Sequence, residues 1–168
     1  MVKQNTINFC PNNRELKSMA EELIRKQSTL TLATAKGNRA WAAPVYYVFF
    51  KSAFYFFSDP KSRHIQEALE AGNASAAIYP SVFAWRDIRG MQMSGKIIKV
   101  SSGLEAIRAI RHYIRKFPFT KEFFGESETM DRDGFGNHFH VRLYKFTPNI
   151  AYYLDNRIHF GFRTEINL

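Results

Sequence analysis

Hydrophobic and polar residues alternate along much of this chain, and a period of two is typical of strands with one buried face. Residues 28–36, 39–50 and 87–100 alternate in this way, and residues 53–58 form a short apolar run of strand length. Residues 74–80 consist mainly of small residues, so we expect this strand to be buried on both faces.

The alternation returns near the C-terminus, in residues 139–147 and, after Pro148, in residues 150–154. Short turns join most of these segments, and strands that follow one another through short turns pair antiparallel. The pattern therefore predicts six or seven strands in an antiparallel, barrel-like sheet with helices packed outside it.

A period of three to four residues predicts three helices. Asn12 and Glu15 have the spacing of a capping box at the start of the first helix, and Gly72 is placed to end the second. A chain of 168 residues with these elements and no linker is expected to form a single domain, residues 1–168. The helical segments are residues 14–26, 62–71 and 102–117.

The turn between the strand at 53–58 and the second helix carries the most suggestive chemistry. Ser58 ends the strand, and Lys61, Ser62, Arg63 and His64 follow just before the helical pattern. Free N–H groups at a helix start, with hydroxyl and basic side chains beside them, favour an anion such as a phosphate. An ordinary N-cap with solvated basic residues is the competing interpretation, and on the turn alone it is the commoner one.

Two strands contain residues that favour a flat ligand. In one strand, the small Ala43 leaves open space beside Pro44, which has no backbone N–H. This combination indicates either a ligand against the backbone or an edge-strand bulge. Gln92 lies between Gly90 and Gly95, and glycine in a strand marks a bulge or the close approach of a ligand or another backbone. Gln92 itself fits a contact to a heterocycle or an ordinary solvent-facing position.

Composition narrows the class of protein. The net charge is +9, which suits an anionic ligand, and the basic helix at 102–117 raises nucleic-acid binding as an alternative. Cys10 is the single cysteine, so no internal disulfide is possible. No apolar run has membrane-spanning length, the N-terminus lacks a signal-peptide core, and the histidines lack metal-site spacing. We expect a cytoplasmic protein without a metal.

The segments STLTLATAKGNRAWAAPVYYVF, FYFFSDPKSRHIQEAL and WRDIRGMQMSG, in that order, resemble the FMN-binding split-barrel family, the pyridoxamine 5′-phosphate oxidase-like proteins. The ending NIAYYLDNRIHFGFRTEINL is similar to that of a small bacterial subgroup of this fold. The resemblance implies an α+β fold, a six-stranded antiparallel split β-barrel with flanking helices.

The resemblance also implies a homodimer with two flavin sites between the subunits. It places Ala43, Pro44, Val45 and Tyr46 beside the flavin ring. The phosphate would be held by the turn after the strand, and two residues would reach the flavin from the partner subunit. The turn residues are Ser58, Lys61, Ser62, Arg63 and His64, and the partner residues are Gln92 and Trp85.

The sequence departs from true pyridoxamine 5′-phosphate oxidases, because no arginine-rich substrate motif occurs near its end, FRTEINL. We therefore expect an FMN-dependent oxidoreductase on another small molecule, with NAD(P)H or oxygen as co-substrate. FAD, deazaflavin, haem or an empty site are alternative outcomes for this fold. A non-catalytic flavin-binding or sensing protein and a basic nucleic-acid-binding module are the alternative functions.

Overall fold

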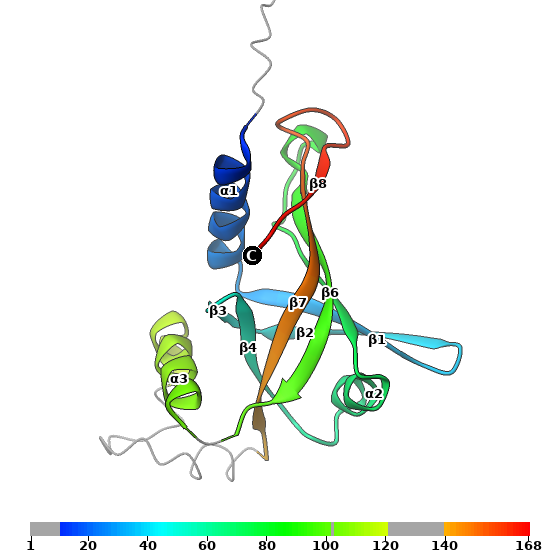
Figure 1. Ribbon diagram of the computed structural model, residues 1–168, viewed down its shortest axis with the longest axis vertical. Helices are drawn as coiled ribbons and strands as arrows, with labels where there is room; N and C mark the ends of the chain where they lie inside the picture. Colours follow the sequence, from blue (N-terminus) through cyan, green and yellow to red (C-terminus); the bar gives the residue numbers. More distant parts are fainter. Residues whose placement is uncertain (1–10, 102, 121–139) are drawn as a thin grey trace, which may run out of the picture.

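The computed structural model describes residues 11–101, 103–120 and 140–168, and within them the chain folds as one eight-stranded antiparallel sheet with three α-helices (Figure 1). Cys10 and residues 121–139 lie outside the described residues. The helices are α1 Asn13–Lys26, α2 Arg63–Ala71 and α3 Leu104–Lys116. The strands are β1 Thr29–Lys36, β2 Arg39–Tyr46, β3 Val48–Phe50, β4 Ala53–Ser58, β5 Ala74–Ile78, β6 Arg89–Lys99, β7 Arg142–Asp155 and β8 Arg163–Glu165.

The sheet curls because its two ends are consecutive in the chain. Its strand order is β2-β1-β5-β6-β7-β4-β3, with β8 pairing β7, so β2 and β3 lie at opposite ends of the path. One residue, Tyr47, separates β2 from β3. The predicted α+β fold with an antiparallel split barrel is confirmed, and the prediction of one strand over 39–50 is wrong.

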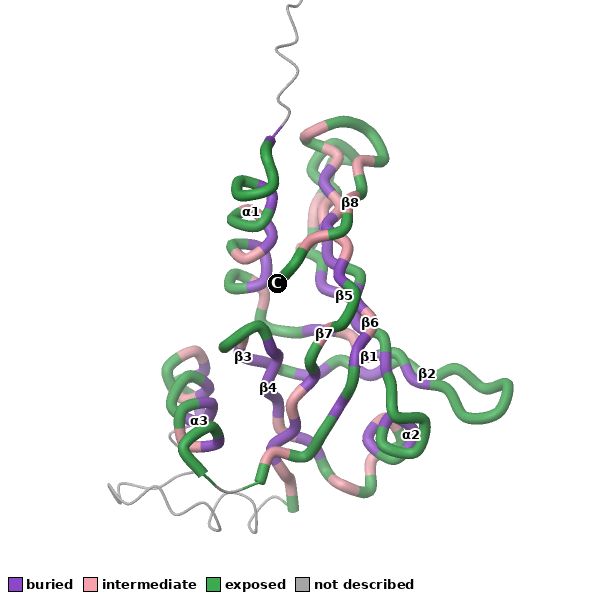
Figure 2. The backbone as a smooth tube through the Cα atoms, in the orientation of Figure 1, coloured by how far each residue is buried: buried purple, intermediate pink, exposed green. Residues whose placement is uncertain are grey.

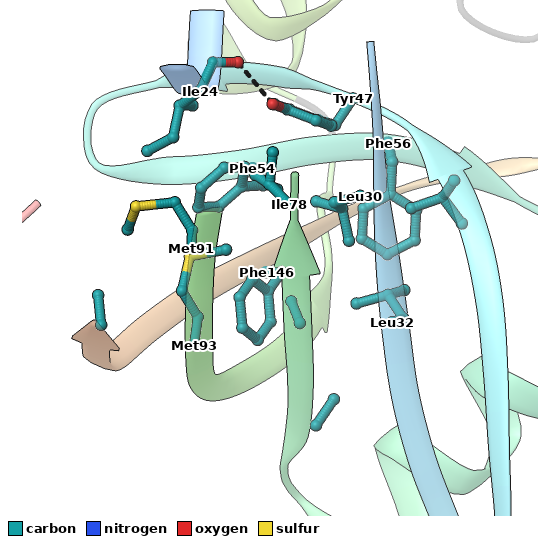
Figure 3. Close-up of a cluster of buried hydrophobic side chains, with 14 of the residues drawn as sticks. Ile24, Leu30, Leu32, Tyr47, Phe54, Phe56, Ile78, Met91, Met93 and Phe146 are labelled. Atoms are coloured by element: carbon teal, nitrogen blue, oxygen red, sulfur yellow. Dashed lines mark hydrogen bonds between the residues drawn. The ribbon is translucent and has the colours of Figure 1, made fainter. Parts of the chain in front are cut away.

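Tyr47 interrupts that strand because its polar groups turn toward the N-terminal part of the chain. Its amide donates to the Ser28 carbonyl over 3.1 Å, and its buried hydroxyl donates to the Ile24 carbonyl over 2.5 Å (Figure 3). The ring packs edge-on against Phe54, with the ring centroids 5.2 Å apart. This residue therefore fixes the end of α1 against the closure of the sheet.

Six strands of the described residues have five residues or more, and these correspond to the predicted barrel strands. The three-residue strands β3 and β8 extend the sheet. The expectation that residues 74–80 are buried on both faces is wrong: in β5, Ala74, Ala76 and Ile78 are buried, whereas Ser75 is exposed. The strand pairs with β1 and β6 in the sheet, and one of its faces remains open to solvent.

β7 runs without a break through Pro148, where the sequence predicted two segments. The register of β7 against β6 shifts between Ser94 and Gly95, and this bulge accommodates Pro148 within the strand. A Cβ at Gly95 would lie 2.2 Å from the Thr147 carbonyl oxygen. The close approach that Gly95 permits is therefore to backbone and not to a ligand. The same holds at Gly90, where an added Cβ would lie 2.9 Å from the Ile78 carbonyl oxygen.

The helices pack on the outside of the curled sheet, each with its apolar face inward (Figure 2). The predicted capping box at α1 is present: the Asn12 side chain accepts from the amides of Arg14 and Glu15, and the Glu15 carboxylate accepts from the Asn12 amide. α2 ends at Gly72 in the left-handed conformation, as expected.

Two buried clusters form the core. The larger fills the curled sheet beneath α1 and α2 and includes the rings of Phe54, Phe56 and Phe146 (Figure 3). The smaller lies under α3, where Ala109 and Tyr113 pack on Tyr55 of β4. Burial of this aromatic surface is the main stabilising contribution to the fold.

Candidate functional site

Three side chains of the turn between β4 and α2 converge. The Ser58 hydroxyl lies 3.1 Å from the Ser62 hydroxyl and 2.9 Å from Nε2 of His64, and Ser62 Oγ lies 3.4 Å from the same nitrogen. Ser58 is the last residue of β4 and is buried, whereas Ser62 and His64 are half-buried. The strand end and the first turn of α2 thus place two hydroxyls and an imidazole around one point at the surface.

Ser62 occupies the N-cap position of α2, but its side chain does not cap the helix. Its hydroxyl donates instead to the Asp59 carbonyl over 2.7 Å. The amides of the first helical turn, at Arg63 and His64, therefore keep their N–H groups free of side-chain acceptors in the described part of the chain. Ser62 thus stands at the N-cap position without the side-chain bond of an ordinary N-cap, whereas the exposed Lys61 agrees with the solvated basic residues of that interpretation.

Electrostatics at the turn favour an incoming anion. Burial lowers the pKa of His64 below its ordinary value of 6.5, so the ring is neutral at pH 7. The exposed Lys61 donates its backbone amide to the Asp59 carboxylate over 2.7 Å, and no ion pair holds its ammonium group among the described residues. The positive end of the α2 dipole adds to this field.

Arg63 points away from the converging hydroxyls. Its Nε donates to the Glu67 carboxylate over 2.6 Å, and its guanidinium lies 4.7 Å from the centroid of the Trp41 ring. Glu67 is buried and also accepts from the Thr34 hydroxyl, which with Arg63 lowers the pKa of its carboxyl. Sequence reasoning missed this network, although the i, i+4 spacing of Arg63 and Glu67 could have indicated it.

β2 is an edge strand that lies beside this turn, as the contact of Trp41 with Arg63 shows. Ala43 and Val45 point into the core, whereas Pro44 and Tyr46 are exposed. The pairing of β2 with β1 is continuous, with no bulge. Of the two interpretations of the proline, the bulge is excluded, and the outer edge of β2 is not paired with another described strand.

Trp85 and Gln92 lie far from the turn in the same copy of the chain. Gln92 pairs with Tyr152, near the end of β7 that is opposite to Arg142, although it is in register with Pro44 through β5 and β1. Ser58 pairs with Arg142 at the start of β7, whereas Trp85 accepts a hydrogen bond from Asn156, just past the end of that strand. Fourteen residues of β7 at about 3.3 Å each separate the two ends by roughly 40 Å of strand. Both side chains are exposed, Trp85 on a single turn of 3₁₀ helix and Gln92 on β6.

No cluster of three or more histidine, cysteine or acidic residues with the geometry of a metal site occurs in the described ranges. Among those residues, no helix combines the length and apolar character that crossing a bilayer requires.

Curated bacterial proteins match somewhat more than half of this chain. A UPF0306 protein YhbP of Escherichia coli is 33% identical over 104 residues, a match that covers 58% of this chain and 67% of that protein. A UPF0306 protein of Cronobacter sakazakii is 30% identical over 101 residues, covering 58% and 69%. No protein-family model matches the chain.

Solved structures of low sequence identity share the fold. Campylobacter jejuni ChuZ superposes with a TM-score of 0.71 at 10% identity, over 94% of this chain and 61% of that one. A FAD-binding protein from Mesorhizobium loti gives 0.59 at 12% identity, and the heme storage protein HutZ from Vibrio cholerae gives 0.61 at 12%; each match covers 80% of this chain and 90% of the other. Split barrels that hold flavin or haem thus have the architecture seen here.

Proposed function

This chain belongs to the family of UPF0306 proteins, and from that premise we propose that it is a flavoprotein that binds FMN and uses it to oxidise or reduce a small organic molecule. The observation that carries the proposal is the uncapped start of α2 beneath the converging Ser58, Ser62 and His64 side chains. The FAD-binding protein of the same fold supports a flavin as the ligand.

The phosphate of FMN would occupy the point toward which these groups converge. The hydroxyls of Ser58 and Ser62 can turn to donate, the amides at Arg63 and His64 donate along the helix axis, and Lys61 supplies charge. Neutral His64 donates through Nε2 in one tautomer, or takes up a proton when the phosphate dianion neutralises the cost of its burial. Arg63 acts indirectly, since its ion pair with Glu67 positions the first turn of α2.

The ring of FMN would lie along the outer edge of β2, past Ala43, Pro44, Val45 and Tyr46. The contact between Trp41 and Arg63 brings this edge beside the phosphate turn. The edge offers backbone groups to polar atoms of the ring, and Tyr46, half of whose surface is exposed, offers an aromatic face. Bound FMN would supply the hydride- and electron-transfer chemistry, and the protein would bind it, orient it and limit its contact with water.

Because Trp85 lies at the far end of β7 from the turn, we propose that a second copy of the chain completes each site. In a two-fold dimer, Trp85 and Gln92 of one copy would approach the β2 edge of the other. Their exposure in the single chain is consistent with such a role, as is the exposed aromatic surface around Trp85, where Phe160 packs on its ring.

The test is an absorption spectrum of the purified protein, followed by titration of the flavin-free protein with FMN. We expect a flavin spectrum, or a rise in melting temperature when FMN is added at 100 times its dissociation constant, since ligation then contributes about 2.7 kcal/mol. Parallel titrations with hemin and FAD test whether the protein binds one of the other ligands of proteins with this fold. Failure of all three to bind, with the protein folded, would contradict the proposal.

Anaerobic addition of NADH or NADPH to the FMN complex separates an enzyme from a storage or sensing protein. Bleaching of the flavin band by either nucleotide is expected for the oxidoreductase. A flavin that binds tightly but is reduced by neither nucleotide, while dithionite reduces it, would favour the non-catalytic alternative.

A further inference from the structure

The outer face of α3 forms a basic groove with β3 and the end of α1. One hollow of about 560 Å³ is lined by residues of all three elements, and a second of about 230 Å³ is lined by α3 alone. His112 and Arg115 line both, so the hollows adjoin; together they are called the α3 groove. Its residues are Arg25, Val48, Phe49, Phe50, Lys51, Arg108, Arg111, His112, Arg115 and Lys116.

Within the part of the chain that the structure describes, the charge in the α3 groove is largely uncompensated. Arg25 pairs with Glu21 over 2.7 Å, and Lys116 donates to the Gln27 carbonyl over 2.6 Å. Arg108, Arg111 and Arg115 are exposed and make no ion pair with the described part of the chain, and neither hollow is lined by an acidic residue.

The acidic residue of α3 lies outside the groove. Glu105 accepts hydrogen bonds from Lys145 over 2.8 Å and from the Tyr55 hydroxyl over 2.6 Å. Both partners lower the pKa of its carboxyl, so the carboxylate is held on β4 and β7 and does not neutralise the arginines.

Arg108, Arg111 and Arg115, which make no ion pair among the described residues, form a row. They occupy positions i, i+3 and i+7 of α3, which places them on one face over about 10 Å of helix axis. The opposite face is anchored in the core by Ala106, Ala109 and Tyr113, so the row cannot rotate inward. Guanidinium groups bind phosphate in a two-pronged geometry, and a row of this length suits several linked phosphates better than a single one.

An aromatic wall lies beside the row. The Phe50 ring stacks on His112, with centroids 4.8 Å apart and an interplanar angle of 28°. Phe49, the preceding residue of β3, packs instead on Phe54 in the larger core cluster. A flat heterocycle can pack on such a wall while its charged tail follows the arginines. The larger hollow also lies in the size range of small-ligand sites.

We propose that the α3 groove binds a nucleotide with two or more phosphates, its base against Phe50 and His112 and its phosphates on Arg108, Arg111 and Arg115. The row of arginines lies away from the phosphate turn of the proposed flavin site, because α3 and α2 lie on different sides of the sheet (Figure 1). A nucleotide is favoured over a longer nucleic acid because the charged row spans only about 10 Å.

Isothermal titration calorimetry of the full chain with ATP, AMP, pyrophosphate and adenosine tests both halves of the proposal. We expect ATP to bind at least about tenfold more tightly than AMP, since it places more phosphates on the arginines. ATP is also expected to bind more tightly than pyrophosphate, because pyrophosphate lacks a base, and adenosine is expected not to bind. Pyrophosphate binding as tight as ATP, or no ATP binding at 1 mM (about −4 kcal/mol), would overturn the proposal.

The decisive variant replaces Arg108, Arg111 and Arg115 by glutamine. We expect ATP affinity to fall at least about 30-fold, from lost hydrogen bonds to charged phosphates. The matched control replaces Arg14, Lys17 and Lys96 by glutamine; these exposed residues lie outside the α3 groove, and the loss of charge is identical. An equal loss in both variants would overturn the proposal, since it would reduce the effect to net charge.

Two further binding measurements distinguish failure of this proposal from failure of the flavin proposal. The arginine variant should retain FMN affinity, and the Ser62→Ala/His64→Ala variant should retain ATP affinity. Loss of ATP binding in the latter would place ATP in the flavin site and overturn the α3 site. Binding of a ten-nucleotide oligothymidylate more than tenfold tighter than ATP, abolished by the arginine variant, would overturn it in favour of single-stranded nucleic acid.

Discussion

Nε2 of His64 lies 2.9 Å from the hydroxyl of Ser58, so the first turn of α2 is tied by side chains to the last residue of β4. Backbone pairing alone would not hold these two elements in this relation. The bond orients the imidazole toward the point where Ser62 and the helix amides also meet, and three predictions concern this arrangement.

The double variant Ser62→Ala/His64→Ala is expected to weaken FMN binding by about 2–4 kcal/mol, roughly 30- to 900-fold, because hydrogen bonds to a charged phosphate are lost. Fluorescence quenching of FMN on binding measures the change. The exposed pair Ser18→Ala/His159→Ala is the matched control and should bind like the parent. Unchanged affinity in the first variant would place the phosphate elsewhere.

The stability of the ligand-free protein should fall as pH decreases through 6.5. Burial lowers the pKa of folded His64 below that value, so the unfolded chain binds the proton first and protonation favours unfolding. The loss levels off below the folded pKa. Urea unfolding at pH 7.5 and pH 5.5 measures the effect, and His64→Gln should show a smaller drop between these pH values. If the free energy of unfolding falls equally in the parent and the variant, His64 is not the cause of the pH dependence.

Two defective variants should restore FMN binding to each other when mixed as subunits. Ser62→Ala/His64→Ala damages the phosphate turn, and Trp85→Ala/Gln92→Ala damages the residues proposed to act across the dimer. A heterodimer of the two carries one site with both defects and one with neither. Co-refolded mixtures should therefore bind FMN tightly at up to one site per heterodimer. No recovery, with dimers confirmed by sedimentation, would mean that each chain completes its own site.

Gly95→Ala should destabilise the fold by about 1–3 kcal/mol or more, because its Cβ would lie 2.2 Å from the Thr147 carbonyl oxygen and the backbone of β7 would have to move. Urea unfolding measures the loss. Gly37→Ala is the comparison: its φ of +58° carries a conformational cost of about 1 kcal/mol, but no atom lies within 4 Å of the added Cβ. A smaller loss at Gly95 than at Gly37 would contradict the bulge geometry.

Tyr47→Phe should lower the free energy of unfolding by about 1 kcal/mol, since the Ile24 carbonyl loses a buried donor over 2.5 Å. The exposed Tyr79→Phe removes a hydroxyl of the same kind and should leave stability unchanged. If both variants unfold at the same urea concentration as the parent, the closure of the sheet does not depend on this bond.

The sequence was sufficient for those features that depend on neighbouring residues. The alternation of Thr and Leu in 28–36, the capping box at Asn12 and the left-handed Gly72 are local patterns, and each appears in the structure. The convergence of Ser58, Ser62 and His64 was accessible for the same reason, because these residues lie within a stretch of seven.

Features set by distant partners were not accessible. The break at Tyr47 depends on carbonyls of Ser28 and Ile24, which lie in other elements. The pairing of Arg63 with Glu67 could have been predicted from their i, i+4 spacing in a helix. The burial of Glu67 against Thr34 could not, because it depends on where β1 lies. The basic face of α3 was visible as a pattern, whereas its hollow against β3 follows from packing alone.

The unpaired outer side of β2 has a consequence for the protein in a crowded cell. An open strand edge is a template on which foreign chains assemble, and proteins that keep one open need a means of discouraging such pairing. Pro44, near the end of that edge, offers no N–H to an incoming strand. The proline that we propose lies beside the flavin ring therefore also disfavours aggregation at this edge.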